Sequence, residues 1–583
     1  MLNRVRNGKF IFLIALLGAT GCQTIAGRIF LPRDGVRPAE YSVTAERGVA
    51  TIMADGTPLV SKVYRPKNLE KSPTLLVRIP MSDSFRNRLM ANLLGEFCAS
   101  RGYAVVVQQT RGRWPSGGTF YPMRPDRADG IDTLKWISQQ SWYDGRIGMW
   151  GGSSFGYTQW CIADQTDPGP SAYMIQIASS HIYDLFYQGN AFALETALYW
   201  AYRGHRDWDK TPPTRILDQG VNGFPLVEAD DRASEDIPFF NDWTRHVTRD
   251  AYWTEIDRQD QLRKLRAPVH LIAGWYDPFL PAQLDDFIQI RRDGDQRAAK
   301  GTRLVIGPWS HAATVTFPDG FKDTLYRTAI LEPMIDWFDT HLTGVSDVAL
   351  AMPPVKLFVM GANQWRDEQE WPLARARETA YYLRSDGHAN TATGGGHLSL
   401  EPARSAEPPD AYTYDPINPV PIAGGAVLGP RAGVVIQNDI EQRHDVLVYT
   451  TPTLTQDTEV TGPIRLILFV ATSASNTDFT AKLVDVHPNG DAYNVCDGIR
   501  RRSYTQSKGT TKIAIELWPT SMLFFKDHSI RLEVSSSSFP RFDRNPNTGR
   551  FIPTETKPVS ALQQVHHGPA TPSRLLLPLI PAE

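Results

Sequence analysis

A serine surrounded by glycines is the residue of this chain best placed to do covalent chemistry. Ser153 lies in the segment 146–156, where an apolar run is followed by two glycines, the serine and a stretch typical of a helix. A strand, a sharp turn and a helix in that order form a nucleophile elbow, because only small neighbours let strand and helix approach closely. Such a serine, supplied with a histidine and a carboxylate, hydrolyses esters or amides through an acyl-enzyme.

A carboxylate and a histidine follow Ser153 at the ends of two later strand-like segments. The segment 269–273 runs into Asp277, and the segment 303–306 runs into His311. In α/β-hydrolases the triad follows the chain order Ser, Asp or Glu, then His, on loops at the C-terminal ends of strands. The sequence therefore predicts a triad in which Ser153 attacks, His311 is the base and Asp277 orients the imidazole.

A parallel sheet has to hold these residues together, and the first part of the chain has the pattern of one. Strand patterns at 74–79 and 103–108 alternate with helical patterns at 89–102 and 128–140. This alternation predicts a doubly wound α/β domain. The sheet resumes with the strands before Asp277 and His311.

Two further regions have a different residue composition and pattern. The stretch 180–264 is rich in aromatic and charged residues, and we interpret it as a helical cap. After about residue 353, short strands such as 355–359, 446–449 and 464–470 alternate with Pro, Gly, Asn and Asp turns, which indicates an all-β sandwich or jelly roll. We therefore expect an α/β-hydrolase domain at 40–178 and 265–345, a cap at 179–264, and a C-terminal all-β jelly-roll domain at 350–583.

The N-terminus has the pattern of an export signal. Basic residues among the first nine precede an apolar run at 10–17, and small residues at 18–21 lead to Cys22. This pattern predicts a secretory signal peptide over 1–21. The position of Cys22 resembles a bacterial lipobox, in which this cysteine is lipidated. This predicts export to the bacterial periplasm or cell envelope and a lipid anchor on Cys22, with the outer membrane favoured. A plain signal peptide cleaved nearby is the alternative.

The composition bears on other classes of partner and cofactor. A formal net charge of -2 offers no electrostatic case for nucleic acid. Cys98, Cys161 and Cys496 are far apart and odd in number, so they indicate neither a disulfide framework nor a metal site, and we expect them to be buried. The predicted hydrolysis needs no metal or organic cofactor. The sequence leaves the oligomeric state open.

Many short motifs follow one another along the chain in the same order as in one known family. Those of the first part are TRG, WYDGRIG, YTQW, GWYD and GPWSH, and those of the β region are YDP, DVHPNG and SSFPRF. With them the chain, from about residue 51 onward, resembles the cocaine esterase and X-Pro dipeptidyl-peptidase group of serine hydrolases, which also holds α-amino-acid ester hydrolases and glutaryl-cephalosporin acylases. The resemblance implies an α/β-hydrolase domain, a helical cap and a jelly roll, and a small acyl ester, amide or short peptide as substrate.

The resemblance also implies which serine attacks. The literal pattern G-x-S-x-G at 152–156 has Ser154 at its centre. The family instead places one glycine two residues before the nucleophile and another three residues after it, followed by TQW. That register selects Ser153, and it puts the backbone N–H of Ser154 in the oxyanion hole.

The second oxyanion donor departs from the family pattern. The family uses the tyrosine hydroxyl of a Pro-Tyr pair, where this chain has Pro80 and Met81. A thioether has no hydrogen to donate. Either Ser82, Ser84 or a backbone N–H substitutes for it, or the enzyme is slow on simple esters.

Two alternative functions stay open. A dipeptidyl-peptidase would use the same triad and would need an acidic group for the substrate's amino terminus, which Glu195, Asp207 or Asp209 of the cap could supply. A non-catalytic, lipid-anchored binding protein would explain Met81, although the intact triad argues against it. Ester or amide hydrolysis is the function that the sequence favours.

Overall fold

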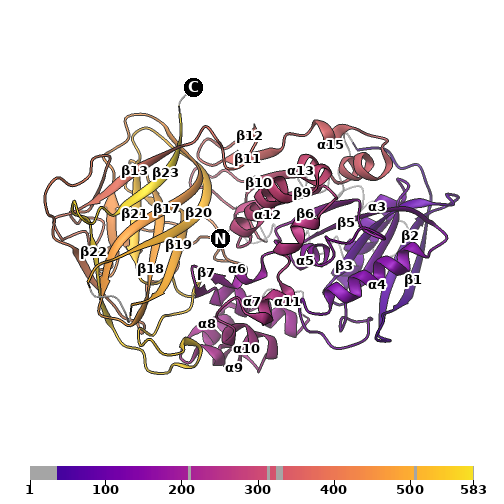
Figure 1. Ribbon diagram of the computed structural model, residues 1–583, viewed down its shortest axis with the longest axis horizontal. Helices are drawn as coiled ribbons and strands as arrows, with labels where there is room; N and C mark the ends of the chain where they lie inside the picture. Colours follow the sequence, from indigo (N-terminus) through magenta and orange to yellow (C-terminus); the bar gives the residue numbers. More distant parts are fainter. Residues whose placement is uncertain (1–35, 208–211, 312–314, 324–332, 505–508, 582–583) are drawn as a thin grey trace, which may run out of the picture.

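The computed structural model describes residues 36–207, 212–311, 315–323, 333–504 and 509–581 (Figure 1). The predicted signal peptide and Cys22 lie outside these residues. No helix among the described residues has the length and apolar character needed to cross a membrane. Cys98, Cys161 and Cys496 are free cysteines, and their burial agrees with the prediction that they lie inside the protein.

A ten-stranded sheet forms the frame of the first domain, in the order β1-β2-β4-β3-β5-β6-β9-β10-β11-β12. Its six strands from β4 to β10 are parallel, and their apolar residues are mostly buried, as expected for a sheet covered on both faces. The strands are β1 (Val43–Ile52), β2 (Pro58–Pro66), β3 (Ser72–Ile79), β4 (Ala104–Gln109), β5 (Tyr143–Gly152), β6 (Ala172–Gln176), β9 (Val269–Tyr276), β10 (Arg303–Ser310), β11 (Val355–Val359) and β12 (Gln364–Glu368).

Helices connect these strands and cover the sheet. They are α3 (Phe85–Ala99), α4 (Asp126–Ser138), α5 (Ser154–Trp160), α12 (Leu280–Asp293), α13 (Gln296–Gly301), the π-helical turn η3 (Asp339–Thr343) and α15 (Val348–Ala351). The helix predicted at 89–102 begins four residues earlier, because Ser84 caps it by accepting a hydrogen bond from the Asn87 N–H at 3.2 Å.

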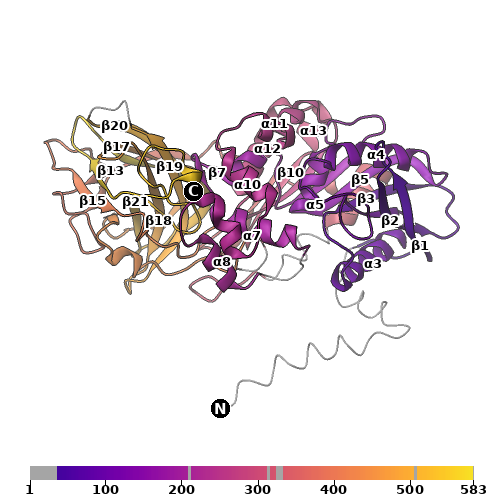
Figure 2. The same ribbon diagram turned by 90° about the horizontal axis from the view of Figure 1, so that it is seen from below.

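The cap lies between β6 and β9 in the chain. It is found at the lower centre of Figure 1, and in both views it lies between the two large sheets (Figures 1 and 2). Stacked aromatic rings hold its short helices together, with the Phe186 and Trp243 ring centroids 4.4 Å apart. Its elements are α6 (Ile182–Phe186), β7 (Tyr187–Gln188), β8 (Ala191–Phe192), α7 (Leu194–His205), α8 (Thr214–Val221), η1 (Leu226–Glu228), α9 (Ala229–Ala233), α10 (Pro238–Arg245), α11 (Ala251–Ile256) and η2 (Gln259–Lys264).

The C-terminal part forms a second, eleven-stranded sheet, which we call the β domain. Nearly all its strand pairs are antiparallel. The strands are β13 (Arg377–Arg384), β14 (His397–Ser399), β15 (Asp410–Tyr414), β16 (Leu447–Thr450), β17 (Thr458–Thr472), β18 (Asn476–Val486), β19 (Ala492–Ser503), β20 (Thr511–Phe524), β21 (Ser529–Ser535), β22 (Ala561–His566) and β23 (Arg574–Ile580), with the turns η4 (Ile440–Gln442) and η5 (Ile552–Thr554).

The boundary between the two sheets differs from the prediction. The strand predicted at 355–359 was assigned to the jelly roll, but β11 pairs in parallel with β10, and β12 extends the same sheet. The antiparallel sheet of the C-terminal part therefore begins with β13 rather than with β11. A short strand between two turns has the same local pattern in either sheet, so its pairing partner decides where it belongs.

Candidate active site

Ser153 stands on the sharp turn between β5 and α5. Its φ of 55° and ψ of -129° are unusual for a residue with a side chain. A Cβ added to Gly156 would lie 2.6 Å from the Ala178 Cβ, so a glycine is needed where α5 approaches the strand end. The Ser153 N–H donates to the Gln176 carbonyl at 2.9 Å, which fixes the turn against β6.

The structure brings the three residues of the predicted triad together. His311, directly after β10, places Nε2 2.9 Å from the Ser153 Oγ and Nδ1 2.6 Å from the Asp277 Oδ2. Asp277 is buried after β9, and its other oxygen accepts the Phe279 N–H at 2.8 Å. The Phe279 ring stacks on the imidazole, with centroids 5.5 Å apart. The imidazole is therefore positioned by Asp277 at Nδ1 and by the Phe279 ring against its face.

The residues predicted around the oxyanion lie at the ends of β5 and β3. As the first residue of α5, Ser154 has an N–H that needs no acceptor within the helix. Met81 lines the pocket beside Ser153, together with Pro80. The Ser82 hydroxyl accepts the Trp114 N–H at 3.1 Å, and the Ser84 hydroxyl caps α3. Both hydroxyls therefore serve to fold the loop after β3.

All three parts of the molecule line the pocket at Ser153. The cap contributes Tyr199, Trp200, Arg203, Gly204 and Asp207, while Leu428 comes from the C-terminal part. Leu428 and Trp200 are pocket residues that the sequence does not predict. Leu428 carries no local signal, because only tertiary packing brings it to the other domain.

A buried arginine also went unnoticed in the sequence, although it directly follows the TRG motif. Arg113 lines the pocket, and its guanidinium lies 3.3 Å from the Phe120 ring centroid and 3.4 Å from Asp207. Burial lowers the pKa of Arg113 to about 10, although Asp207 acts in the opposite direction. The Asp207 carboxylate also accepts the Ser82 N–H at 2.9 Å.

The acidic residues considered for binding an amino terminus have different surroundings. Asp207 lines the pocket, as described above, whereas Glu195 is buried and binds Arg431 at 2.6 Å. Burial raises the pKa of Glu195, and Arg431 opposes that shift. Asp209 lies outside the described residues. The carboxylate at the pocket is therefore one that already faces a cation.

Comparison with known sequences identifies the family. Residues 55–313 match the model of the X-Pro dipeptidyl-peptidase (S15 family), and residues 347–576 match that of the X-Pro dipeptidyl-peptidase C-terminal non-catalytic domain. The chain is 37% identical to a cocaine esterase of Rhodococcus sp. (strain MB1 Bresler) over 586 residues, covering 93% of this chain and 99% of the relative.

Solved structures share the whole architecture. An aminopeptidase from a marine sediment Thaumarchaeota archaeon has a TM-score of 0.75 at 24% identity, covering 94% of this chain and 99% of its own. An α-amino acid ester hydrolase has a TM-score of 0.73 at 22% identity, covering 94% and 98%. The predicted fold class, an α/β-hydrolase domain followed by an all-β domain, is confirmed. The chain belongs to the family of serine hydrolases that holds cocaine esterase and the X-Pro dipeptidyl-peptidases.

Proposed function

We propose that this enzyme hydrolyses small acyl esters through an acyl-enzyme formed on Ser153. The observation that carries the proposal is the continuous hydrogen-bond relay from the Ser153 Oγ through His311 to Asp277, with distances of 2.9 and 2.6 Å. A serine hydroxyl becomes a strong nucleophile when a base in this geometry accepts its proton.

The reaction follows from the positions of these groups. The Ser153 Oγ attacks the acyl carbonyl while His311 Nε2 takes the proton. Asp277 keeps Nδ1 protonated and stabilises the imidazolium. His311 then gives the proton to the leaving alcohol, and water repeats the sequence on the acyl-enzyme.

Two backbone N–H groups are the proposed oxyanion donors. In this fold the hole is formed by the N–H of the residue after the nucleophile and by an N–H from the loop after the third strand. Those groups are here Ser154 and Met81, both at the pocket that contains Ser153. Methionine in place of the family's tyrosine therefore removes one hydroxyl donor, but two backbone N–H donors remain for the oxyanion.

An ester fits this pocket better than an X-Pro peptide does. A free amino terminus needs a carboxylate that no other cation holds. Asp207 lies 3.4 Å from Arg113 and also accepts the Ser82 N–H, so its charge is already engaged. The curated relative at 37% identity is described as an esterase, which supports the same choice.

The test combines a covalent probe with a substrate panel. A fluorophosphonate should label the wild type and Ser154→Ala but not Ser153→Ala, because only the nucleophile reacts. Asp277→Asn should lower kcat about 10⁴-fold at an unchanged melting temperature. Among aryl esters, acyl-anilides and X-Pro-anilides, the esters should have the highest kcat/KM. Labelling of Ser153→Ala, or a preference for X-Pro-anilides, would contradict the proposal.

We also propose that the protein is exported and anchored to the cell envelope through a lipid on Cys22. The support is the basic, apolar and small-residue pattern of residues 1–21 before that cysteine. Stable anchoring needs more than one acyl chain, as on a lipoprotein cysteine. Cys22→Ala should move the protein from the membrane to the soluble fraction. Mass spectrometry should find an acylated Cys22 at the N-terminus of the wild type, and an unmodified one would contradict the anchor.

A further inference from the structure

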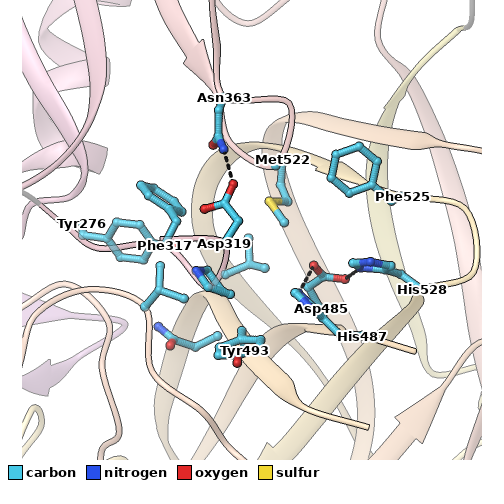
Figure 3. Close-up of a pocket in the computed structure, with 15 residues that line it drawn as sticks. Tyr276, Phe317, Asp319, Asn363, Asp485, His487, Tyr493, Met522, Phe525 and His528 are labelled. Carbon is cyan, nitrogen blue, oxygen red and sulfur yellow. Dashed lines mark hydrogen bonds and ion pairs between the residues drawn. The ribbon is translucent and has the colours of Figure 1, made fainter. Parts of the chain in front are cut away.

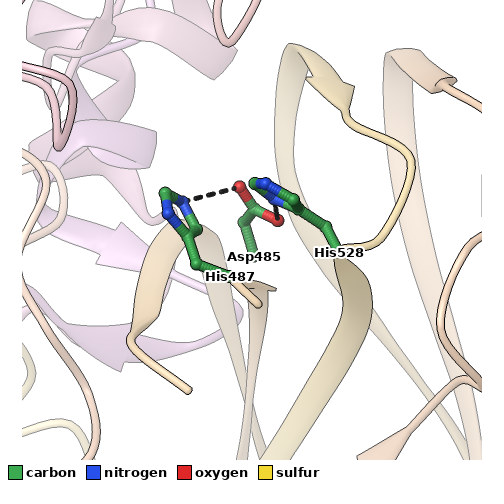
Figure 4. A group of neighbouring side chains, drawn as sticks. All are labelled: Asp485, His487 and His528. Carbon is green, nitrogen blue, oxygen red and sulfur yellow. Dashed lines mark hydrogen bonds and ion pairs between the residues drawn. The ribbon is translucent and has the colours of Figure 1, made fainter. Parts of the chain in front are cut away.

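Three side chains of the β domain converge outside the active site. Asp485 at the end of β18, His487 in the following turn and His528 before β21 have ligand atoms that all lie within 4.8 Å of one another (Figure 4). His528 Nδ1 lies 2.9 Å from Asp485 Oδ1, and His487 Nε2 lies 3.3 Å from Asp485 Oδ2. Ligand atoms on a tetrahedral Zn²⁺ are about 3.4 Å apart, given metal–ligand distances of about 2.1 Å. The two distances from Asp485 to the histidines are close to that value.

Asp485 is a buried carboxylate whose ionic partners among the described residues are two histidines. Its side chain is only 3% exposed, and a buried carboxylate requires a compensating positive charge. Among the described residues, Asp485 pairs with the two histidines and with no arginine or lysine. Asp478, another buried carboxylate of the β domain, has such a cation in Arg501, at 2.8 Å. A bound metal ion would provide the missing charge.

The backbone holds both histidines in place before any ion binds. The His487 N–H donates to the Asp491 carbonyl at 2.8 Å, and the His487 carbonyl accepts the Gly490 N–H at 2.9 Å. The His528 carbonyl accepts the Leu454 N–H at 2.8 Å. Ligands fixed in this way lose little conformational entropy on binding.

A metal ion can reach the cluster from solvent, and three protein ligands would leave further coordination positions free for solvent. The three residues line a pocket between the two large sheets, whose opposite wall includes Tyr276, Phe317 and Asp319 (Figure 3). His487 is 27% exposed and His528 11% exposed. Solvent in the pocket can therefore complete the coordination of an ion held by three protein ligands.

We propose that Asp485, His487 and His528 form a binding site for a divalent transition-metal ion, with Zn²⁺ as the ion that best matches two imidazoles and one carboxylate. The ligand atoms are the Asp485 carboxylate, His487 Nε2 and His528 Nδ1. When each imidazole binds as the neutral tautomer, its proton resides on the ring nitrogen that faces away from the metal. The site ties together the turns that precede β19 and β21, where the β domain meets the hydrolase domain.

The test measures Zn²⁺ binding directly. The full chain, prepared without a polyhistidine tag and freed of metal with a chelator, is titrated with ZnCl₂ in a calorimeter. We expect about one high-affinity ion per chain, and a Tm that rises when Zn²⁺ is added. His487→Ala and His528→Ala should each weaken binding at least about tenfold, because each removes a ligand. Replacing Zn²⁺ by Co²⁺ should give visible absorption bands that the variants lack.

The controls separate this site from other histidines. His388 forms an exposed pair with Asp386 at 3.3 Å, and no third ligand joins this pair among the residues that the structure describes. His388→Ala should therefore bind Zn²⁺ like the wild type. Asp485→Asn keeps the side-chain shape and should also weaken binding, which serves if an alanine variant fails to fold. The proposal is overturned if the wild type binds no Zn²⁺, or if the folded ligand variants bind it as tightly as the wild type.

Discussion

Ser153 is held in a backbone conformation that few side chains adopt. Most other described non-glycine residues with positive φ are asparagine or aspartate, which tolerate it best. Ser153 also has a ψ of -129°, outside the left-handed helical region. Strain of this kind persists where the surrounding structure imposes it, and it gathers at functional sites. Here it directs the hydroxyl toward His311.

Met81 stands where the family pattern has a tyrosine, and a tyrosine introduced at this position tests the effect of that departure. Met81→Tyr should raise kcat on aryl esters about tenfold or more, because an added hydroxyl donor stabilises the oxyanion. Met81→Phe has nearly the same size without the hydroxyl and should not raise kcat. Steady-state kinetics of both variants make the comparison, and equal rates would show that the tyrosine hydroxyl does not reach the oxyanion.

At the scale of secondary-structure elements, a charged histidine and carboxylates connect helices α6 and α12. His181, just before α6, lies 3.2 Å from Asp184 and 3.6 Å from Asp286 of α12. Burial opposes the charge on His181, but the two carboxylates outweigh it and raise the pKa of His181 to about 9. Burial raises the pKa of Asp286 to about 6. The charged histidine thus helps to join the cap to the hydrolase domain.

Because of the charged histidine between α6 and α12, the protein should become less stable at alkaline pH. Because the folded pKa of His181 exceeds its ordinary value of about 6.5, its contribution is complete below that pH and is lost as the pH rises through about 9. The free energy of unfolding in urea should fall by on the order of 2 kcal/mol between pH 6.5 and 9.5. His181→Gln should lack this fall, whereas His246→Gln, at an exposed pair, should retain it. An unchanged pH profile in His181→Gln would contradict the assignment.

The whole molecule depends on close contact between the cap and the β domain. Backbone hydrogen bonds join them, from the Arg501 N–H to the Gly189 carbonyl at 2.8 Å and from the Asp543 N–H to the Phe192 carbonyl at 2.9 Å. The largest cluster of buried apolar side chains continues from the hydrolase sheet through the cap into the β domain. The pocket at Ser153, which receives Leu428, relies on this docking.

Gly189 allows this close contact. A Cβ at Gly189 would lie 1.9 Å from the Ile499 carbonyl oxygen, and its φ is +54°. Gly189→Ala should lower the free energy of unfolding by about 2 kcal/mol or more, because the backbones must separate. Gly48→Ala, at a φ of +71° with nothing within 4 Å, carries only the conformational cost and should lose less. Calorimetric melting compares the two, and equal losses would mean that the contact is not tight.

The sequence by itself determined the chemistry and the kind of frame that carries it. The glycine-flanked Ser153 and the polar residues after two strand patterns predicted the nucleophile, Asp277 and His311 in chain order. Strand and helix alternation predicted the parallel sheet. Such features are local, because turn residues, hydrophobic period and neighbouring glycines act within a few positions of the chain.

Only the tertiary structure decided which distant segments meet. It placed β11 beside β10 in the hydrolase sheet, and it brought Leu428 to the pocket of Ser153. It also placed His528 against Asp485, 43 residues away in the chain, in a cluster for which the sequence shows no metal-binding spacing. These outcomes depend on strand pairing and domain packing between remote segments, and no local pattern records them.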